Sequence, residues 1–426
     1  MKACVLRSLL LLAAVSLTAT VQAQVAETRE TPQQVALRAA RLIDVRSGNT
    51  IPDAVVLIEG DRIKAVGSNL AIPSDAQTFD LGNVTLLPGL IDAHTHLLHQ
   101  YYREFGDDNA NRILETVQMG PAKRALLGAK LAREMLEAGF TTVRDLGNSG
   151  VNGDVALRDA VNSGWLIGPR IFASTRALSP VGGQFQSLTP GAQRLIEQEY
   201  VPVSGVEDAR RAVRQAIYDG ADCIKVIVNS GPRMMSLEEM KVIVEEAHRA
   251  NRRVAAHATD GDSAALIAAE AGVDSIEHAY TISEKVLNIM AKKKIFLVPT
   301  DALGVERYQA RIQRAVRAGV RIAIGSDLYY LYAGKTRGQV AAGMYNTYVA
   351  SGMSTVEVLR AATMNAADLI DPAQSTGAIE AGRMADIIAV KGDLLKDIAN
   401  LERVEFVMKG GQVIKGDLRP GTTLAQ

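Results

Sequence analysis

Two of the six histidines in this chain stand one residue apart, in the sequence His94-Thr95-His96. They follow the apolar run 84–91, which has the composition of a buried β-strand. Side chains two residues apart on a strand point to the same side, so both imidazoles can bind one cation. A surface pair of histidines would have the same spacing, so this pair becomes informative only with the partners found later in the chain.

A repeated pattern predicts the elements that position these residues. A helical stretch, a glycine and a short β-branched run occur in this order four times, with the glycines at Gly139, Gly220, Gly272 and Gly319. Each glycine fits the position after a helix, where a left-handed backbone is common. The run behind each glycine has the composition of a buried parallel strand. With 84–91 and the candidates 170–174, 253–257 and 296–300, the chain has eight predicted strands.

Helical patterns fill the spaces between these strands, at 206–219, 237–250 and 264–271, with Ser236 as an N-cap. Strands that alternate with helices favour a parallel sheet covered by helices. Eight such units over residues 89–379 match the size of a (β/α)8 TIM barrel, which we expect to be the catalytic domain. A doubly wound open sheet is the alternative, but no glycine-rich phosphate loop follows the first strand.

The two flanks of the barrel region resemble each other. Residues 24–88 and 380–426 contain short alternating runs interrupted by glycine, asparagine, aspartate or proline. We expect both termini to build one small β-sandwich domain, because neither end has enough strands to complete it alone.

The first 23 residues have the features of a signal peptide. Lys2 and Arg7 precede an apolar stretch at 9–17, and small residues favour cleavage after Ala23. A periplasmic or secreted protein without a membrane anchor after cleavage is therefore expected, and a retained anchor is the alternative. Export would leave Cys223 as the only cysteine, so no intramolecular disulfide can form. Balanced charges, 47 basic and 47 acidic residues, with 4% aromatic residues argue against a nucleic-acid partner.

The carboxyl ends of barrel strands meet at one mouth, so ligand candidates far apart in sequence should converge there. The six residues that follow or end the predicted strands are His94, His96, Lys225, His257, His278 and Asp327. Imidazole and carboxylate ligands suit Zn²⁺, and other divalent metals remain open. An ammonium cannot bind a cation, but a buried neutral lysine can react with CO2 to form a carbamate that bridges two metals. An ion pair between Lys225 and an acidic neighbour is the alternative.

The metal-dependent amidohydrolase superfamily has a first-strand signature that closely resembles Leu87-Pro-Gly-Leu-Ile-Asp-Ala-His94-Thr-His96. Its later motifs resemble Gly220-Ala-Asp-Cys-Ile-Lys225-Val, Val254-Ala-Ala-His257-Ala, Ser275-Ile-Glu-His278-Ala and Ile324-Gly-Ser-Asp327. The tail, with Asn365-Ala-Ala and 377–386, looks like the return of this family into its β-sandwich. The resemblance covers nearly all of the mature chain. It is greatest to the prolidase-like dipeptidase and carboxypeptidase branch, which includes ochratoxin-hydrolysing amidohydrolases.

This resemblance implies a binuclear site with two Zn²⁺ per chain and an N6-carboxylated Lys225 that requires CO2 or bicarbonate. His94, His96 and Asp327 would bind the buried metal, and His257 and His278 would bind the more exposed one. Carboxylated Lys225 and a hydroxide would bridge the pair. The hydroxide would attack the scissile carbonyl, while Asp327, as the catalytic residue, takes a proton and returns it to the leaving amine.

The implied activity is hydrolysis of an amide or peptide bond in a dipeptide, an N-acyl amino acid or a related compound such as an ochratoxin-like amide. A lactonase or phosphotriester hydrolase with the same site is one alternative, and a non-catalytic periplasmic binding protein is another. The expected partners are a small amide or peptide substrate and, in a homo-oligomer, further copies of the chain.

The chain departs from the family pattern in three loops that shape the substrate pocket. It reads Gly182-Gly-Gln184-Phe-Gln186 where relatives resemble Gly-Gly-His-Gly-Asp, and His257-Ala-Thr259 where His-Ala-His is common. The segment 300–311 after the seventh strand is short for the branch. The precise substrate therefore does not follow from the resemblance.

Four further side chains are candidates for substrate binding, and each has a structural alternative. They are His99, Arg233, Tyr329 and Tyr330. His99 could be structural, the tyrosines could pack the loop, and the arginine could face solvent instead of a substrate carboxylate. Glu277, beside His278, is predicted by strand alternation to point away from the mouth and to have a structural role.

Overall fold

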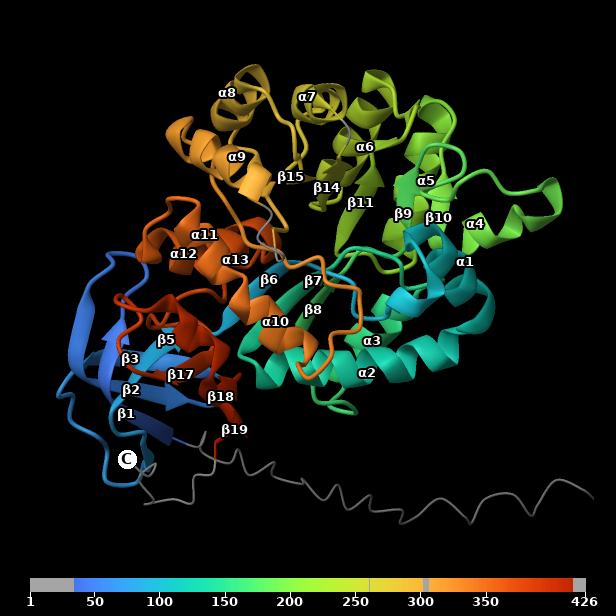
Figure 1. Ribbon diagram of the computed structural model, residues 1–426. Coiled ribbons are helices and arrows are strands. Elements are labelled where there is room, and N and C mark those ends of the chain that lie inside the picture. Colours follow the sequence, from blue (N-terminus) through green and yellow to red (C-terminus); the bar gives the residue numbers. More distant parts are fainter. Residues whose placement is uncertain (1–33, 260, 302–305, 417–426) are drawn as a thin grey trace, which may run out of the picture.

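The computed structural model describes residues 34–259, 261–301 and 306–416 (Figure 1). A sheet built from the two ends of the chain lies beside a barrel of parallel strands, and helices cover the barrel (Figure 1). The predicted signal peptide, residues 1–23, lies outside the described residues. Among the helices of the described part, none is long and apolar enough to cross a membrane.

Strands from both termini form one eight-stranded sheet, in the order β19-β18-β17-β5-β1-β2-β3 with β4 beside β1. Its strands are β1 (Gln34–Ile43), β2 (Thr50–Glu59), β3 (Arg62–Ser68), β4 (Gln77–Asp80), β5 (Val84–Pro88), β17 (Ile387–Lys391), β18 (Val404–Lys409) and β19 (Gln412–Lys415). The N-terminal strand β5 pairs with β1 on one side and with the C-terminal strand β17 on the other. The prediction that both termini build one β-domain is confirmed, and β5 is the strand that joins them.

The barrel uses strands at the positions that the sequence predicts. They are β6 (Leu90–Thr95), β7 (Phe140–Asp145), β8 (Arg170–Ala173), β11 (Cys223–Ile227), β14 (Arg253–Ala258), β15 (Ser275–His278), β16 (Phe296–Val298) and an eighth segment, 321–324. The prediction of one strand over 84–91 is wrong, because the run divides at Gly89 into β5 of the terminal sheet and β6 of the barrel. A Cβ atom at Gly89 would lie 2.2 Å from Thr141 Oγ1, so only glycine allows the chain to pass so close to the strand β7.

Individual hydrogen bonds connect the barrel strands around the ring. The strands β6, β7 and β8 form one parallel sheet, and β11, β14, β15 and β16 belong to another. Asp222 N donates to Ala173 O (2.8 Å) and so links β8 to β11. On the other side, the segment 321–324 bonds to Leu297 of β16 and accepts a bond from Ala93 N of β6 (2.9 Å). The strands therefore follow one another in barrel order, with the predicted fold class.

Helices surround this ring, and their long members pack on its outside (Figure 1). They are α1 (Asp108–Gln118), α2 (Pro121–Glu137), α3 (Gly153–Asn162), α4 (Arg194–Glu199), α5 (Val206–Tyr218), α6 (Leu237–Arg249), α7 (Asp262–Ala271), α8 (Glu284–Lys293), α9 (Glu306–Arg317), α10 (Arg337–Gly343), α11 (Tyr345–Ala350), α12 (Thr355–Ala361) and α13 (Met364–Ile370). The predicted helices 206–219, 237–250 and 264–271 correspond to α5, α6 and α7. Ser236 caps α6 in a capping box with Glu239, which satisfies donors that the first turn leaves free.

The four glycines of the repeated pattern explain how each helix turns into the next strand. Their φ angles are all positive: 99° at Gly139, 97° at Gly220, 87° at Gly272 and 76° at Gly319. A side chain would strain the backbone at these angles. The short connections bring each strand back into register with its neighbour, so the carboxyl ends of the strands meet at one face.

Candidate metal centre

Six predicted ligand residues line one cavity of about 330 Å³ at the carboxyl ends of the barrel strands. His94 lies in β6, with His96 just after it; Lys225 lies in β11, His257 in β14 and His278 at the end of β15, and Asp327 follows the segment 321–324. The structure therefore brings together the full predicted set.

The tightest part of this cluster is formed by His94, His96 and Asp327, whose ligand atoms all lie within 4.8 Å of one another. Asp327 Oδ1 is 3.1 Å from His96 Nε2 and 3.6 Å from His94 Nε2. Two ligands about 2.1 Å from a tetrahedral Zn²⁺ lie about 3.4 Å apart. These three side chains therefore have the spacing of ligands to a single cation.

Hydrogen bonds orient both imidazoles. His94 Nδ1 donates to Glu277 Oε2 (2.7 Å), and His96 Nδ1 donates to the Gly147 carbonyl (2.8 Å). Each ring therefore turns its Nε2 toward Asp327. Such partners of a ligating histidine fix its tautomer and raise the basicity of the ligand nitrogen.

The Asp327 loop packs directly on the first strand. A Cβ atom at Gly325 would lie 2.5 Å from His94 Cβ and 2.8 Å from His94 N, which explains the glycine two residues before Asp327. Asp327 N donates to His94 O (2.8 Å). Asp92 accepts hydrogen bonds from His94 N (3.0 Å) and Ser326 N (2.9 Å), and burial raises the pKa of Asp92 to about 6. The backbone thus holds both ligand segments in one position.

Lys225 has the surroundings that its predicted carboxylation requires. The side chain is buried, with 2% of its surface exposed, and Nζ lies 3.5 Å from His94 Nε2. The alternative of an ion pair is not found: in the described part of the chain, no carboxylate oxygen lies within 4.0 Å of Nζ. Burial lowers the pKa of Lys225 to about 8. A neutral, nucleophilic amine is therefore accessible near neutral pH.

His257 and His278 form the second part of the cluster, with ring centroids 4.5 Å apart. Thr300 Oγ1 gives its proton to the Pro299 carbonyl, so His278 Nδ1 must donate to Thr300 Oγ1 (2.9 Å) and keeps its lone pair on Nε2. His278 Nδ1 also lies 3.6 Å from Asp327 Oδ2, so one carboxylate faces both parts of the cluster.

The charges of the cluster suit cation binding. Burial first, and then neighbouring charges, lower the pKa of His94, His257 and His278 well below 6.5, so these rings are neutral. Burial alone would raise the pKa of Asp327, but His94 and His96 outweigh it and hold this pKa below its usual value. Neutral imidazoles and a charged carboxylate are the forms in which these residues bind metals.

Glu277 has a larger role than the sequence predicts. The prediction that strand alternation turns it away from the site is wrong, because its buried carboxylate lies inside the barrel and contacts His94 of β6 and Arg144 of β7. Oε1 accepts bonds from Arg144 Nη2 (2.9 Å) and Ser275 Oγ (2.5 Å), while Oε2 holds His94 Nδ1. Strand alternation failed here because the backbone leaves the regular strand at His278, where φ is 66°, so both His278 and Glu277 serve the site.

Two of the four predicted substrate contacts line the cavity, and two do not. His99 and Tyr329 are part of its wall. His99 is buried against Glu115, with its ring centroid 5.8 Å from that of Tyr329. Tyr330 instead lines a hollow beside the mouth, and its hydroxyl donates to Asp108, as that of Tyr329 does.

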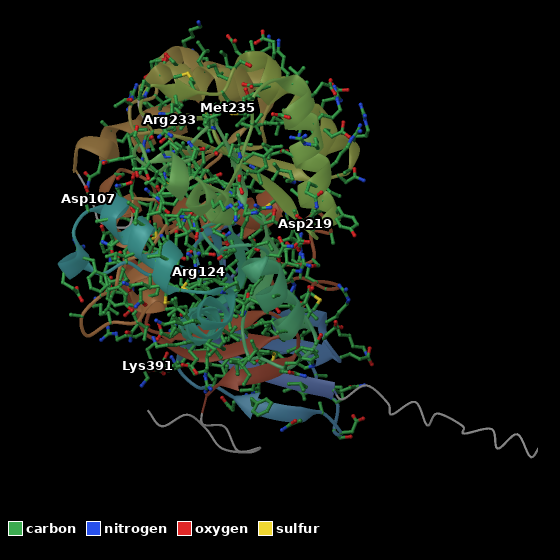
Figure 2. The ribbon with its side chains drawn as sticks, turned by 90° about the vertical axis from the view of Figure 1, so that its right-hand side faces the viewer. Asp107, Arg124, Asp219, Arg233, Met235 and Lys391 are labelled. Atoms are coloured by element: carbon green, nitrogen blue, oxygen red, sulfur yellow. The ribbon has the colours of Figure 1, made fainter. Side chains whose placement is uncertain are left out.

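Arg233 lies on the hairpin of β12 (Asn229–Ser230) and β13 (Arg233–Met234), near Met235 (Figure 2). Its guanidinium donates to the carbonyls of Val181 (3.0 Å) and Phe185 (2.8 Å). These bonds stabilise the loop after β9 (Ala177–Ser179) and keep Arg233 outside the cavity wall, so the predicted substrate contact is not seen.

Other cavity residues were not predicted. Arg112 of α1, Tyr101, Asn148 and Tyr280 all line the wall. None stands at a strand end, where the sequence analysis looked for functional residues. The amphipathic pattern of 108–118 could have indicated the helix, but not that Arg112 would reach the mouth.

The departures from the family pattern gather around His257. Gln184 Nε2 lies 3.4 Å and Thr259 Oγ1 3.3 Å from His257 Nε2. The Gln184 side chain is held by Tyr200, whose hydroxyl donates to Gln184 Oε1 (2.9 Å). The third departure, the segment 300–311, lies partly outside the described residues.

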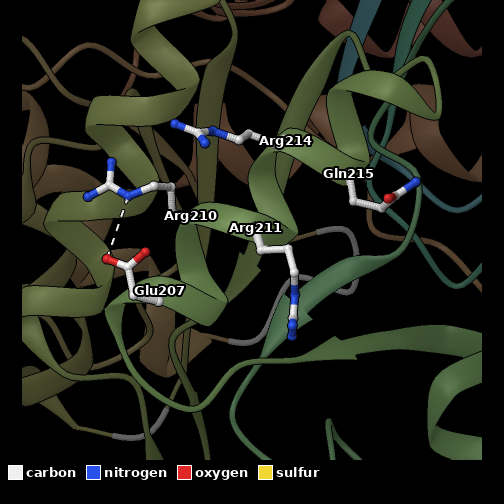
Figure 3. Close-up of a pocket in the computed structure, with 5 residues that line it drawn as sticks. All are labelled: Glu207, Arg210, Arg211, Arg214 and Gln215. Carbon is white, nitrogen blue, oxygen red and sulfur yellow. Dashed lines mark ion pairs between the residues drawn. The ribbon is translucent and has the colours of Figure 1, made fainter.

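A second hollow, of about 270 Å³, has a different character. It lies on the outer face of α5 and is lined by charged side chains (Figure 3). Arg210 and Arg214 bond to Glu246 of α6 (3.1 and 2.6 Å), and Arg211 bonds to Asp208 (2.8 Å). These arginines are neutralised by neighbouring carboxylates and hold α5 against α6, so we interpret the hollow as a solvated helix face.

A (β/α)8 barrel whose mouth holds two buried histidines and a partly exposed aspartate is the architecture of a metal-dependent hydrolase. The profile of the Amidohydrolase family matches residues 85–414, so the chain belongs to this family, whose members generally use metal ions.

Similar proteins agree with this assignment. The chain is 32% identical to an ochratoxinase of Aspergillus niger over 88% of its own length and 86% of the relative's. The crystal structure of the A. niger ochratoxinase matches 92% of this chain and all of its own, with a TM-score of 0.77 and 30% identity. A Xaa-Pro dipeptidase with methionine in its active site matches 90% of this chain and all of its own, with a TM-score of 0.78 and 28% identity. The chain is thus a hydrolase of the amidohydrolase superfamily.

Proposed function

We propose that this protein is an exported, binuclear metal-dependent amidase that cleaves dipeptides, N-acyl amino acids or related amides. The observation that carries this proposal is the convergence of four imidazoles, Asp327 and the amine of Lys225 in one cavity. A single-metal site would not need a buried lysine whose Nζ lies 3.5 Å from a histidine ligand atom.

The donor set fits two divalent cations, preferably Zn²⁺. His94, His96 and Asp327 would hold one, and His257 and His278 would hold the other. Lys225, carboxylated by CO2 or bicarbonate, would supply the anion between them. When bound, the cations would polarise the scissile carbonyl and lower the pKa of a water molecule from about 16 to about 7.

Asp327 is the residue placed to move the proton. Its two oxygens face opposite parts of the cluster, with Oδ1 near His94 and His96 and Oδ2 near His278. It is charged and partly exposed to the cavity, which suits a general base that takes a proton and then returns it to the leaving amine. Glu277 and the Gly147 carbonyl hold the two histidine rings beside it.

The size of the cavity supports a small substrate. Its volume of about 330 Å³ is at the lower end of the range for ligand pockets, about 300–1,000 Å³. A dipeptide or N-acyl amino acid fits this range better than a protein. The relatives add two substrate classes for testing, Xaa-Pro dipeptides and ochratoxin-like amides.

The test is amino-acid release from a pool of dipeptides, N-acyl amino acids and an ochratoxin-like amide, by protein reconstituted with zinc and bicarbonate. We expect release that a chelator abolishes, with about two metal ions bound per chain. Activity of the same sample on lactones or phosphotriesters alone would contradict an amidase, and one metal ion per chain would contradict the bridging lysine.

The proposal that the protein is exported needs a separate test. The protein recovered from the periplasm or the culture medium should begin at Gln24 by N-terminal sequencing. An intact N-terminus on cytoplasmic protein would contradict export.

A further inference from the structure

Arg112 is a cation of the cavity wall without an acidic partner. It projects from α1 and lines the metal cavity. Its Nη1 donates to the Gln184 carbonyl (2.9 Å), while its Nε is buried without a hydrogen-bond partner. Across the described ranges, no carboxylate oxygen lies within 4.0 Å of its guanidinium nitrogens. Arg112 is half-buried in the wall, so its charge faces the cavity and is available to an anion that binds there.

The nearest acid on the same helix is engaged elsewhere. Asp108, one turn before Arg112, accepts the hydroxyl protons of Tyr329 (3.2 Å) and Tyr330. These bonds turn the carboxylate toward the loop after the eighth strand. Asp108 therefore does not neutralise Arg112, although both residues line the same cavity.

Arg112 is held rigidly on its other side. Phe185 lies beneath the guanidinium, with Cζ 5.8 Å from the ring centroid, and the Tyr200 hydroxyl is a further polar neighbour. A guanidinium has five N–H donors in a planar fork, and the bonds to the Gln184 carbonyl and the Tyr200 hydroxyl use two of them. Donors therefore remain for a bidentate bond to a ligand carboxylate.

One residue connects this arginine to the metal cluster. Gln184 accepts the Arg112 bond through its carbonyl, and its side-chain Nε2 lies 3.4 Å from His257 Nε2. The charge of Arg112 also lowers the pKa of His257, so an anion on Arg112 would lie on the His257 side of the cavity. The free carboxylate of an amino acid is an anion that a guanidinium fork can bind.

We propose that Arg112 binds the free carboxylate of the substrate and so restricts the enzyme to amides of amino acids. This inference rests on the proposed amidase function and adds the substrate group that is recognised. Carboxylate recognition by an arginine fork is directional and charge-assisted, so it gives selectivity as well as affinity.

The test compares an N-acyl amino acid with the N-acyl amino alcohol that bears the same side chain, chosen from the pool assay. The two compounds differ only in the carboxylate. We expect wild type to prefer the acid by about 100-fold in kcat/KM, the size expected for a charge-assisted pair. Arg112→Met should lower kcat/KM for the acid by about 100-fold, mainly through KM, and change that for the alcohol by less than about threefold.

Two controls separate this effect from loss of structure. Arg211→Met removes an arginine on the outer face of α5 that bonds to Asp208 and lies away from the cavity, and it should leave the acid-to-alcohol ratio unchanged. Arg112→Lys keeps the charge without the fork and should give an intermediate ratio. Zinc content and melting temperature should match wild type in all three variants.

A binding measurement keeps the proposal separate from the amidase function. Calorimetric titration with the free amino acid that the pool assay releases, or with N-acetyl-L-phenylalanine if nothing is released, should show about 100-fold weaker binding to Arg112→Met. Absence of amide hydrolysis would reject the amidase and leave this titration as the test of Arg112. Equal binding by wild type and Arg112→Met, or an equal acid-to-alcohol ratio in both, would overturn the proposal.

Discussion

The strongest prediction concerns Glu277, which never touches the cavity but positions His94. We expect Glu277→Gln to weaken zinc binding and to lower activity, while the cavity wall stays as it is. In wild type, Oε1 accepts bonds from Arg144 and Ser275, and Oε2 accepts the bond from His94 Nδ1. A glutamine has one acceptor and one NH2 group, so one side of this network must meet a donor instead of an acceptor.

The magnitude follows from the burial of the network. Arg144 and Glu277 are both almost completely buried, and removing one partner of such a pair costs about 3–5 kcal/mol. Glutamine keeps one hydrogen bond, so we expect stability to fall by somewhat less. Loss of a partner that orients a metal-binding histidine typically lowers metal affinity or activity by about 10–100-fold.

The assay is a competition titration of zinc against a chromophoric chelator, together with kcat/KM on the preferred amide and thermal unfolding. Glu380→Gln is the matched control, because Glu380 also bonds two arginines, Arg46 and Arg383, but is partly exposed in the terminal sheet region. It should cost no more than about 1 kcal/mol and leave zinc affinity unchanged. Zinc affinity and kcat/KM equal to wild type in Glu277→Gln would refute the positioning role.

Three further predictions test the cluster itself. Asp327→Asn should lower kcat by about 10²–10⁴-fold in turnover assays and leave the substrate Kd, measured by calorimetry, within about threefold of wild type. A normal kcat in this variant would exclude Asp327 as the proton carrier. Since the folded pKa of Lys225 is lowered to about 8, the neutral fraction of its amine rises from about a tenth at pH 7 to half at pH 8. Chelator-treated protein given zinc at constant dissolved CO2 should therefore regain activity about fivefold faster at pH 8 than at pH 7. A rate of reactivation independent of pH would contradict this. Gly325→Ala should destabilise the protein by about 1–3 kcal/mol in unfolding experiments and weaken zinc binding, because the added Cβ atom would overlap His94. The control is Gly191→Ala, where the added Cβ atom meets open space, and its stability should match that of wild type.

The barrel and its ligands could be predicted because their signals are local. A glycine after each helix and a short apolar run mark each strand, and the ligand candidates stand at the ends of those runs. Convergence at the mouth then follows from the geometry of a barrel. The division of 84–91 at Gly89 could not be predicted, because it depends on the approach of Thr141 from the next strand.

The residues around the ligands were harder to predict for the same reason. Glu277 and Arg144 are 133 positions apart, and each has a clear role only once the other is beside it. Arg112 belongs to a helix that no strand-end rule singles out, and Arg233 is held by carbonyls of the loop after β9, about 50 positions earlier in the chain. Periodicity gives the direction of a side chain, whereas its partners come from the tertiary structure.

The position of β5 has a consequence for the order in which the protein can fold. Its antiparallel partner β17 ends at Lys391, so during synthesis or translocation β5 emerges long before the strand that covers its edge. Until then the N-terminal strands present an apolar sheet with an unpaired edge, which is a template for aggregation. Contacts so distant in sequence also form slowly. Because β6, with His94 and His96, follows β5 after a single glycine, a chain truncated before β17 should lose its first barrel strand as well, and expression of such a fragment should yield insoluble protein.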